Sequence, residues 1–210
     1  MATITFHDKH GEPLKRFEAG AATKAALAQL DIASGTWALQ PQPVSATPHL
    51  TYVRELQALQ RRFGTVLTDH VQLPQLPMGR PGRNVHGPRA AWPEPDDEHL
   101  HSDPELRVLL RGSVRYVLRA GVPAGWATVV CEPGDWLGLP AAMPHRFEPR
   151  PGEAVEVMRL FTRRAGGVAE RTPRALPSRL ARWDRGHEAH DVISEYAWSK
   201  WSRALRGAAR

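Results

Sequence analysis

The sequence predicts a mainly β chain, folded as an antiparallel β-sandwich or barrel with flanking α-helices. Between residues 105 and 161, apolar side chains recur with a period of two, which is typical of strands. Prolines and glycines divide this region into short segments, and a helical period appears only towards the two ends of the chain. Many short strands with such turns are typical of an antiparallel sandwich or barrel.

The N-terminal elements are one strand and two helices. Ala2, Ile4 and Phe6 alternate with polar residues, which predicts a short strand at a sheet edge. Residues 21–30 are rich in alanine and leucine and predict a helix. Residues 50–63 predict an amphipathic helix that packs on the core. Its apolar residues are Leu50, Val53, Leu56, Leu59 and Phe63.

A long loop over residues 74–97 separates these elements from the main β region. It holds six prolines and three glycines, which do not sustain a helix or an inner strand. The loop leads directly to His99, so we expect it at the mouth of any site there.

The β region follows in short segments. Leu106, Val108 and Leu110 alternate with other residues, Gly112-Ser113 turns the chain, and residues 114–118 return it. Further strands are predicted over residues 126–131, 136–139 and 155–161. Beyond them, residues 171–180 are basic and interrupted by prolines, and Asp191 caps a predicted final helix. This helix packs on its own barrel, on another subunit or on an anionic surface.

Composition limits the classes of function. A chain of 210 residues favours one domain with extensions. One cysteine, Cys131, and no leader-like N-terminus favour the cytoplasm, and no apolar run approaches the ~18 residues of a membrane span. The net charge of +6 lies largely in C-terminal arginines without interleaved aromatic residues, so a solvated tail is favoured over nucleic-acid binding.

One group of residues predicts a metal site. His99 and His101 alternate, which places both imidazoles on one face of a strand, and Glu105 and His145 add a carboxylate and a third imidazole. Such donors suit a divalent transition metal. The alternative is a set of unrelated structural histidines. The remaining histidines lack such a pattern and are expected to be structural or at the surface: His7, His10, His49, His70, His86, His187 and His190.

The spacing carries a resemblance to a known family. Glu105 with Gly112, and Gly134 with Pro140 and His145, resemble the two signature segments of the cupin superfamily. Residues 98–107, 140–147 and 158–161 together resemble the acireductone dioxygenase family. The resemblance implies a cupin-type jelly-roll barrel. Its expected parts are an N-terminal strand and helices packed on the barrel (1–73), the loop (74–97), the barrel core with the metal site (98–165) and a basic extension with a terminal helix (166–210).

The resemblance also implies an activity. One Fe²⁺ or Ni²⁺ per chain, held by His99, His101, Glu105 and His145, would support cleavage of an acireductone by O₂ in methionine salvage. The products are formate and a 2-keto acid with iron, or formate, carbon monoxide and a shorter acid with nickel. The expected partners are therefore a small substrate and O₂, with neither nucleic acid nor membrane, and the chain is expected to be a monomer or a weak homo-oligomer.

Four further residues are candidates for the site. Arg107 lies two residues after Glu105, so strand alternation turns its guanidinium to the same side, where it would stabilise an anionic substrate. The resemblance makes Arg159 a second inward arginine and Phe147 a pocket aromatic. Glu98 is a candidate acceptor for a ligand imidazole. The alternative for all four is a surface salt bridge or ordinary core packing.

The chain departs from the family pattern at two positions. Pro104 stands where the family commonly has an acid, with Asp103 the nearest substitute, and Pro95 stands where an aromatic is common. Two alternatives therefore remain: another metal-dependent cupin dioxygenase or isomerase acting on a different small anionic chelating substrate, and a non-catalytic cupin that binds a metal or ligand. Turnover of an acireductone separates these from the first hypothesis.

Overall fold

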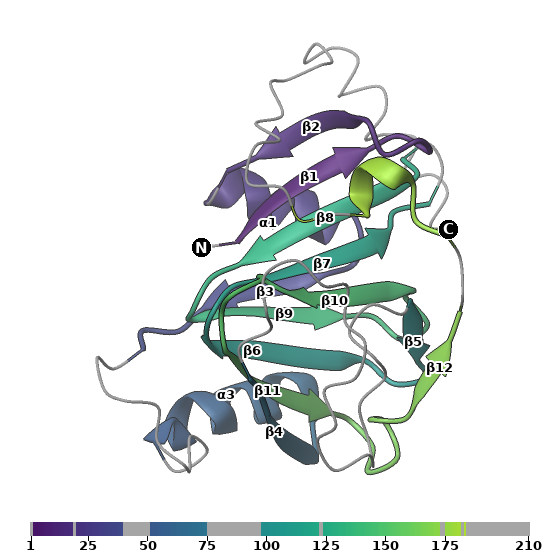
Figure 1. Cartoon of the computed structure of the whole chain (residues 1–210). Coiled ribbons are helices and arrows are strands. Elements are labelled where there is room, and N and C mark those ends of the chain that lie inside the picture. The colour runs from purple at the N-terminus through teal and green to yellow at the C-terminus, as the bar shows by residue number, and fades with distance from the viewer. Residues whose placement is uncertain are drawn as a thin grey trace.

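The computed structural model describes residues 2–18, 20–39, 51–74, 98–121, 124–172, 175–181 and 183. It contains two antiparallel sheets (Figure 1). The larger has seven strands in the order β12 (Ala169–Arg171), β5 (His99–His101), β10 (His145–Pro149), β7 (Val114–Arg119), β8 (Trp126–Cys131), β1 (Thr3–His7) and β2 (Pro13–Phe17). The smaller has five strands in the order β3 (Ala33–Thr36), β9 (Asp135–Leu139), β6 (Glu105–Arg111), β11 (Val155–Phe161) and β4 (Leu67–Leu73). The predicted mainly β, antiparallel fold is confirmed.

The main core lies between the inner faces of the sheets. It includes Phe6, Tyr116 and Phe147 from the larger sheet and Leu109 and Val157 from the smaller one. Helix α1 (Ala21–Ala28) adds apolar residues to this core and packs against β1, β2 and β3. It occupies most of the helix predicted over residues 21–30.

The smaller sheet is buried on its outer face as well. Leu106, Val108 and Leu110 point outward from β6 and pack with Leu56 and Leu59 of helix α3 (Val53–Phe63). Helix α3 ends at Gly64, whose positive φ of 65° is the left-handed conformation common at helix C-termini. In Figure 1 this helix lies next to β4 and β11. Leu56, Leu59 and the partly buried Phe63 of the predicted apolar stripe thus pack on the core, whereas Val53 is 44% exposed and Leu50 lies outside the described residues. The inner face of β6 is left to Glu105 and Arg107.

The predicted edge position of the first strand is wrong. β1 pairs with both β8 and β2, so β2 forms the edge. β2 begins at Pro13, and a proline is tolerated at the start of an edge strand because its missing N–H removes no inner hydrogen bond. The turn at Gly11 was the sequence signal available for this hairpin. The second strand was missed because β2 is largely polar and shows no clear alternation of apolar and polar residues.

The strands on either side of Gly112 belong to different sheets. β6 lies in the smaller sheet, and β7, which returns the chain, lies in the larger one. Gly112 has a φ of +73°, and a Cβ on it would lie 2.4 Å from the carbonyl oxygen of Ala154. The expected turn is therefore a tight crossing from one sheet to the other.

Gly112→Ala is expected to destabilise the fold by about 1–3 kcal/mol from backbone strain alone, with the Ala154 contact adding to this. Urea unfolding of the purified variant measures the change. Gly121→Ala is the control, because Gly121 has a similar φ of +70° but nothing within 4 Å of the added Cβ. Equal losses in the two variants would contradict the close contact at Gly112.

The sheets extend beyond the barrel core expected for residues 98–165. Strands β1 to β4 come from residues 1–73, and β12 comes from the C-terminal extension. Strands β3 and β4 were not predicted, because their alternation is weak, and they pair at the edges of the smaller sheet. Most of the predicted loop, Pro95 and the predicted final helix lie outside the described residues.

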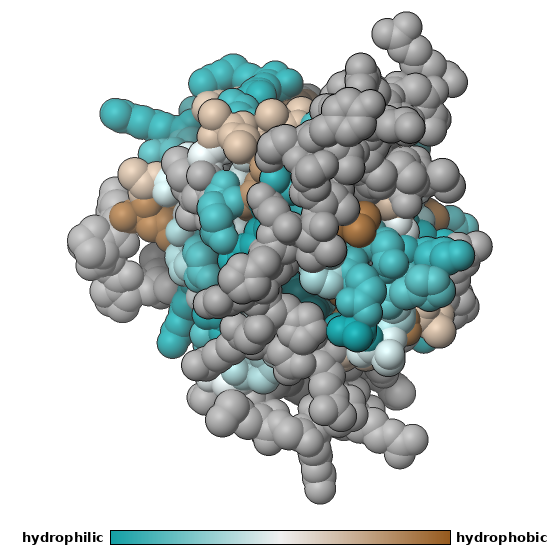
Figure 2. Space-filling view, turned by 90° about the horizontal axis from the view of Figure 1, so that it is seen from above, coloured by the Kyte–Doolittle hydropathy of each residue, from teal (hydrophilic) through white to brown (hydrophobic). Residues whose placement is uncertain are grey.

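Polar side chains dominate the visible described surface. Figure 2 shows hydrophilic side chains over most of the coloured surface seen from above, with apolar ones in small separate groups. Among the described residues, no helix has the length and apolar character needed to cross a membrane.

Candidate metal centre

Three buried imidazoles meet at one end of the barrel. His99 and His101 lie on β5 and His145 on β10, where it pairs directly with His99. The three side chains offer nitrogen atoms that all lie within 4.8 Å of one another, and each residue is 2–3 % exposed. The expected placement of His99 and His101 on one strand face is therefore observed, and a three-histidine metal-binding site is present.

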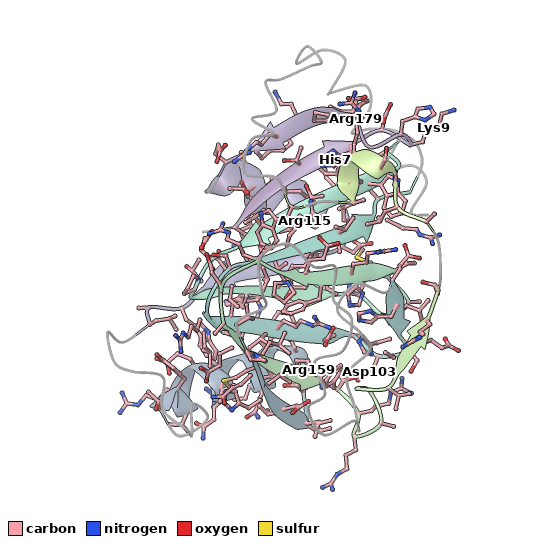
Figure 3. All side chains as sticks on the ribbon, in the orientation of Figure 1. His7, Lys9, Asp103, Arg115, Arg159 and Arg179 are labelled. Carbon is pink, nitrogen blue, oxygen red and sulfur yellow. The ribbon has the colours of Figure 1, made fainter. Side chains whose placement is uncertain are left out.

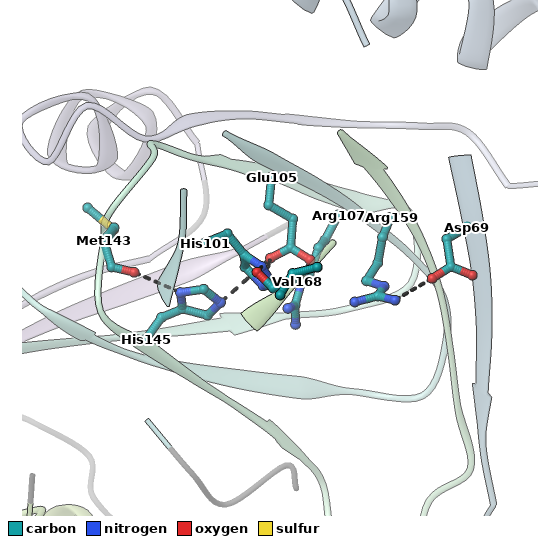
Figure 4. Close-up of polar contacts among 8 residues, drawn as sticks. All are labelled: Asp69, His101, Glu105, Arg107, Met143, His145, Arg159 and Val168. Carbon is teal, nitrogen blue, oxygen red and sulfur yellow. Dashed lines mark hydrogen bonds and ion pairs between the residues drawn. The ribbon is translucent and has the colours of Figure 1, made fainter. Parts of the chain in front are cut away.

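Glu105 approaches these imidazoles from the opposite sheet. It begins β6, and its Oε2 lies 3.6 Å from Nε2 of His101 and 3.6 Å from Nε2 of His145 (Figure 4). The fold thus brings together all four residues that the sequence singled out, although they span 47 positions between His99 and His145.

The hydrogen bonds of two imidazoles fix their orientation. Nδ1 of His101 lies 3.1 Å from the carbonyl oxygen of Val168, and Nδ1 of His145 lies 2.9 Å from that of Met143. A carbonyl only accepts, so each Nδ1 carries the proton and each Nε2 presents a lone pair. This is the arrangement of metal-bound histidines, whose second nitrogen donates to a carbonyl or carboxylate.

The donor atoms fit a cation. Nε2 of His101, Nε2 of His145 and Oε2 of Glu105 are buried without a hydrogen bond, and 3.6 Å is too long for one between them. Buried polar atoms left in this way are costly unless something binds them. Burial also lowers the pKa of His101, which favours the neutral imidazole that a metal requires. The residues present therefore fit a divalent metal.

Arg107 holds the other oxygen of Glu105. Its Nε lies 2.8 Å from Oε1, and its guanidinium packs over the ring of Phe147, 4.7 Å from the centroid. Burial by itself raises the pKa of Glu105, but the charge of Arg107 and the neighbouring histidines outweigh burial and hold that pKa well below its usual range. Glu105 is therefore an anion in this site, with Oε2 directed at the histidines.

Tyr116 is a site residue that the sequence reasoning missed. It is buried on β7, and its ring centroid lies 5.4 Å from that of Phe147. Burial lowers the pKa of Arg107, but the charge of Glu105 and, after it, the interaction with Tyr116 outweigh burial and raise that pKa. Its alternation with Val114 and Leu118 was the signal that turns it inward.

Arg159 lies beside Arg107 on the neighbouring strand. β11 pairs with β6 so that Arg159 faces Arg107 directly, and Arg159 also forms an ion pair with Asp69 of β4. Burial, followed by the charge of Arg107, lowers the pKa of Arg159. Two buried guanidiniums so close together are mutually repulsive, and their positive potential favours an anionic ligand.

Glu98 is engaged by residues of distant segments. Its carboxylate accepts hydrogen bonds from Arg119 and from Thr172 Oγ1. Its expected role as an acceptor for a ligand imidazole stays a prediction.

Two other histidines have structural contacts, as expected. His7 Nε2 lies 2.9 Å from Thr128 Oγ1, and His70 Nε2 lies 2.6 Å from Glu156 Oε1. Both lie away from the three imidazoles on other strands. His10 is exposed, and the other histidines of that group lie outside the described residues.

Comparisons with known proteins match the segment that holds this site. Residues 96–169 match the ARD/ARD' family. The chain is 33% identical over 83 residues to a protein of Gluconobacter oxydans (strain 621H) named acireductone dioxygenase, an alignment that covers 40% of this chain and 43% of that protein. It is 26% identical over 209 residues to a protein of Methylococcus capsulatus (strain ATCC 33009 / NCIMB 11132 / Bath) with the same name, covering 94% of this chain and all of the relative.

A solved structure supports the fold. The acireductone dioxygenase from Bacillus anthracis, with a cadmium ion in its active centre, superimposes with a TM-score of 0.63 at 20% identity and covers 81% of this chain and 98% of its own. The predicted cupin fold is thereby confirmed. The matched segment, residues 96–169, contains all three histidines and Glu105. Residues 96–169 of the chain are therefore similar to the ARD/ARD' family, and the fold is that of a cupin.

Proposed function

We propose that this protein is a metal-dependent dioxygenase that cleaves an acireductone with O₂, giving formate and a 2-keto acid in methionine salvage. One observation carries the proposal: three buried imidazoles and the Glu105 carboxylate lie beside two buried arginines. The name acireductone dioxygenase, shared by the relatives from Gluconobacter oxydans and Methylococcus capsulatus, supports this choice of substrate.

Fe²⁺ or Ni²⁺, one per chain, is the proposed cofactor. His99, His101, Glu105 and His145 would hold it, and the cadmium ion in the Bacillus anthracis protein supports a divalent cation. When bound, such a metal supplies open positions for a chelating enediolate and promotes its reaction with O₂.

The residues of this chain supply charge and shape. Arg107 and Arg159 are proposed to stabilise the anionic oxygens of the substrate, because both guanidiniums lie in the barrel interior next to Glu105. Arg107 also neutralises Glu105 and directs Oε2 towards the histidines. Phe147 and Phe161 are fully buried near these groups and are proposed to exclude water from the pocket.

Asp103 is not a suitable replacement for the acid that Pro104 lacks. Its carboxylate accepts hydrogen bonds from the N–H groups of Thr162 and Arg163, from Thr162 Oγ1 and from Arg163 Nε. Although burial raises the pKa of Asp103, these bonds lower it below its usual value. We therefore propose that the substrate binds already ionised.

Oxygen uptake tests the proposed activity. Protein reconstituted with Fe²⁺ is expected to consume O₂ on addition of a freshly generated acireductone and to release about one formate per O₂, because the products named above require that stoichiometry. Metal-free protein is the control. If protein shown to hold one metal per chain consumes no O₂, the acireductone assignment fails.

The alternative is another metal-dependent cupin dioxygenase or isomerase that acts on a different small anionic chelating substrate. Pro104 favours it, since the family acid is missing there and Asp103 is otherwise engaged. Under either hypothesis we propose a cytoplasmic monomer or weak homo-oligomer whose partners are a small substrate and O₂, with no nucleic-acid partner.

A further inference from the structure

The strand that carries two of the three histidines is held mainly by one neighbour. β5 has three residues and pairs with β10 at one position, where His145 faces His99. On its other side β12 pairs with all three of its residues. A strand this short has little stability of its own, so the positions of His99 and His101 depend on what fastens β12 to them.

Residues 162–172, here called the arch, run from the end of β11 through β12. The arch supplies the carbonyl oxygen of Val168, which accepts from Nδ1 of His101 at 3.1 Å. It therefore acts on β5 both through backbone pairing and through the orientation of one imidazole.

Buried Asp103 fastens the first end of the arch. It lies two residues after His101 and accepts from the backbone N–H of Thr162 at 2.8 Å and that of Arg163 at 2.9 Å. Two side chains of the arch, Thr162 Oγ1 and Arg163 Nε, add bonds at 2.6 and 2.9 Å. Figure 3 places Asp103 at the end of the barrel where β5 and β12 lie.

Buried Glu98 fastens the second end. It directly precedes His99, and its Oε1 accepts from Thr172 Oγ1 at 2.9 Å while its backbone carbonyl accepts from the N–H of Thr172 at 3.0 Å. Oε2 accepts from Arg119 Nε at 2.7 Å. Arg119 follows Leu118, which pairs with His145, so this ion pair also joins β5 to the region of the third histidine.

We propose that Glu98 and Asp103 are positioning residues for the metal site, which act by fastening the arch to the two ends of β5 and so hold His99 and His101 at the spacing a metal requires. The two carboxylates flank the His99–His101 pair in sequence and bind opposite ends of one segment. The inference rests on the metal site and not on the identity of the substrate.

Binding of Co²⁺ to metal-free protein tests the proposal. Glu98→Gln removes the charge that pairs with Arg119, and Thr172→Val removes the hydroxyl while keeping the backbone contact. Both are expected to weaken Co²⁺ binding, measured by competition with a chelating dye. Loss of groups that orient ligands typically weakens a metal site about 10–100-fold, so Glu98→Gln is expected within that range and Thr172→Val near its lower end. The visible spectrum of bound Co²⁺ should change shape in both variants.

Glu148→Gln is the matched control. Glu148 on β10 pairs with Arg115 on β7 in the same sheet, so the change removes the same kind of ion pair without touching β5 or the arch. It is expected to bind Co²⁺ as the unmodified chain does. Urea unfolding of each metal-free variant separates loss of stability from loss of affinity.

Two results would overturn the proposal. One is unchanged Co²⁺ affinity and spectrum in Thr172→Val and in folded Glu98→Gln. The other is an equal loss of affinity in Glu148→Gln. If Glu98→Gln does not fold, Thr172→Val decides alone. Because no substrate is used, failure here is distinct from failure of the acireductone assay.

Discussion

Replacement of His101 by alanine is expected to abolish metal retention. The change removes one of three imidazoles within 4.8 Å and one of the two histidines that lie 3.6 Å from Glu105 Oε2. Metal content after dialysis, measured by mass spectrometry, should fall from about one per chain to nearly zero, because a site that loses one protein ligand holds its metal far less tightly. The metal-free variant should also unfold at lower urea concentration, since a buried carboxylate has lost a partner.

His70→Ala is the control for this variant. Like His101, His70 lies beside a carboxylate, 2.6 Å from Glu156, but it is only partly buried, lies on β4 and is outside the three-histidine cluster. It should retain the metal. Stoichiometric metal in His101→Ala, with both proteins folded, would rule out the proposed ligand set.

Arg107→Met is expected to keep the metal but weaken substrate binding. Methionine fills much of the space next to Phe147 while removing a charged donor. A hydrogen bond to a charged group contributes about 1.5–3 kcal/mol, so KM for the substrate should rise about 10–100-fold. Metal-free protein should lose about 3–5 kcal/mol of stability, because Glu105 would stay buried without its partner at 2.8 Å.

Arg115→Met is the control for Arg107→Met, because it shows what the loss of any buried, paired arginine does to KM. Arg115 is also buried and paired with a glutamate, Glu148, but it points to the outer face of the larger sheet, away from the histidines. Its variant should keep the KM of the unmodified enzyme. Unchanged KM and turnover in Arg107→Met would remove Arg107 from the substrate site.

The site could be predicted where its chemistry is local. His99 and His101 alternate along one strand, and Glu105 and Arg107 alternate along another, so the period of two places each pair on one face before any long-range contact is known. The contact between the two pairs could not be worked out from local patterns. This contact forms because β5 and β6 lie in different sheets that face each other in the folded barrel.

Glu98 illustrates why the remaining contacts could not be predicted. Its charge and its place beside His99 were visible, but its partners come from β7 and from the segment after β12. Two residues 74 positions apart, Glu98 and Thr172, meet only through the register between β5 and β12. Register is set by packing across sheets, because a shift of one residue would turn every side chain to the opposite face.

The sequence by itself determined the antiparallel β class, the extent of the main strands and the donor types that suit a divalent metal. Those features depend on side-chain period, turn residues and ligand chemistry, which are local. Only the tertiary structure decided that β1 lies inside its sheet, that Arg107 faces Arg159, and that the arch pairs with β5. These three features depend on which distant strands become neighbours. The choice of neighbours follows from packing, because the fold must bury both faces of the smaller sheet and the inner face of the larger sheet together.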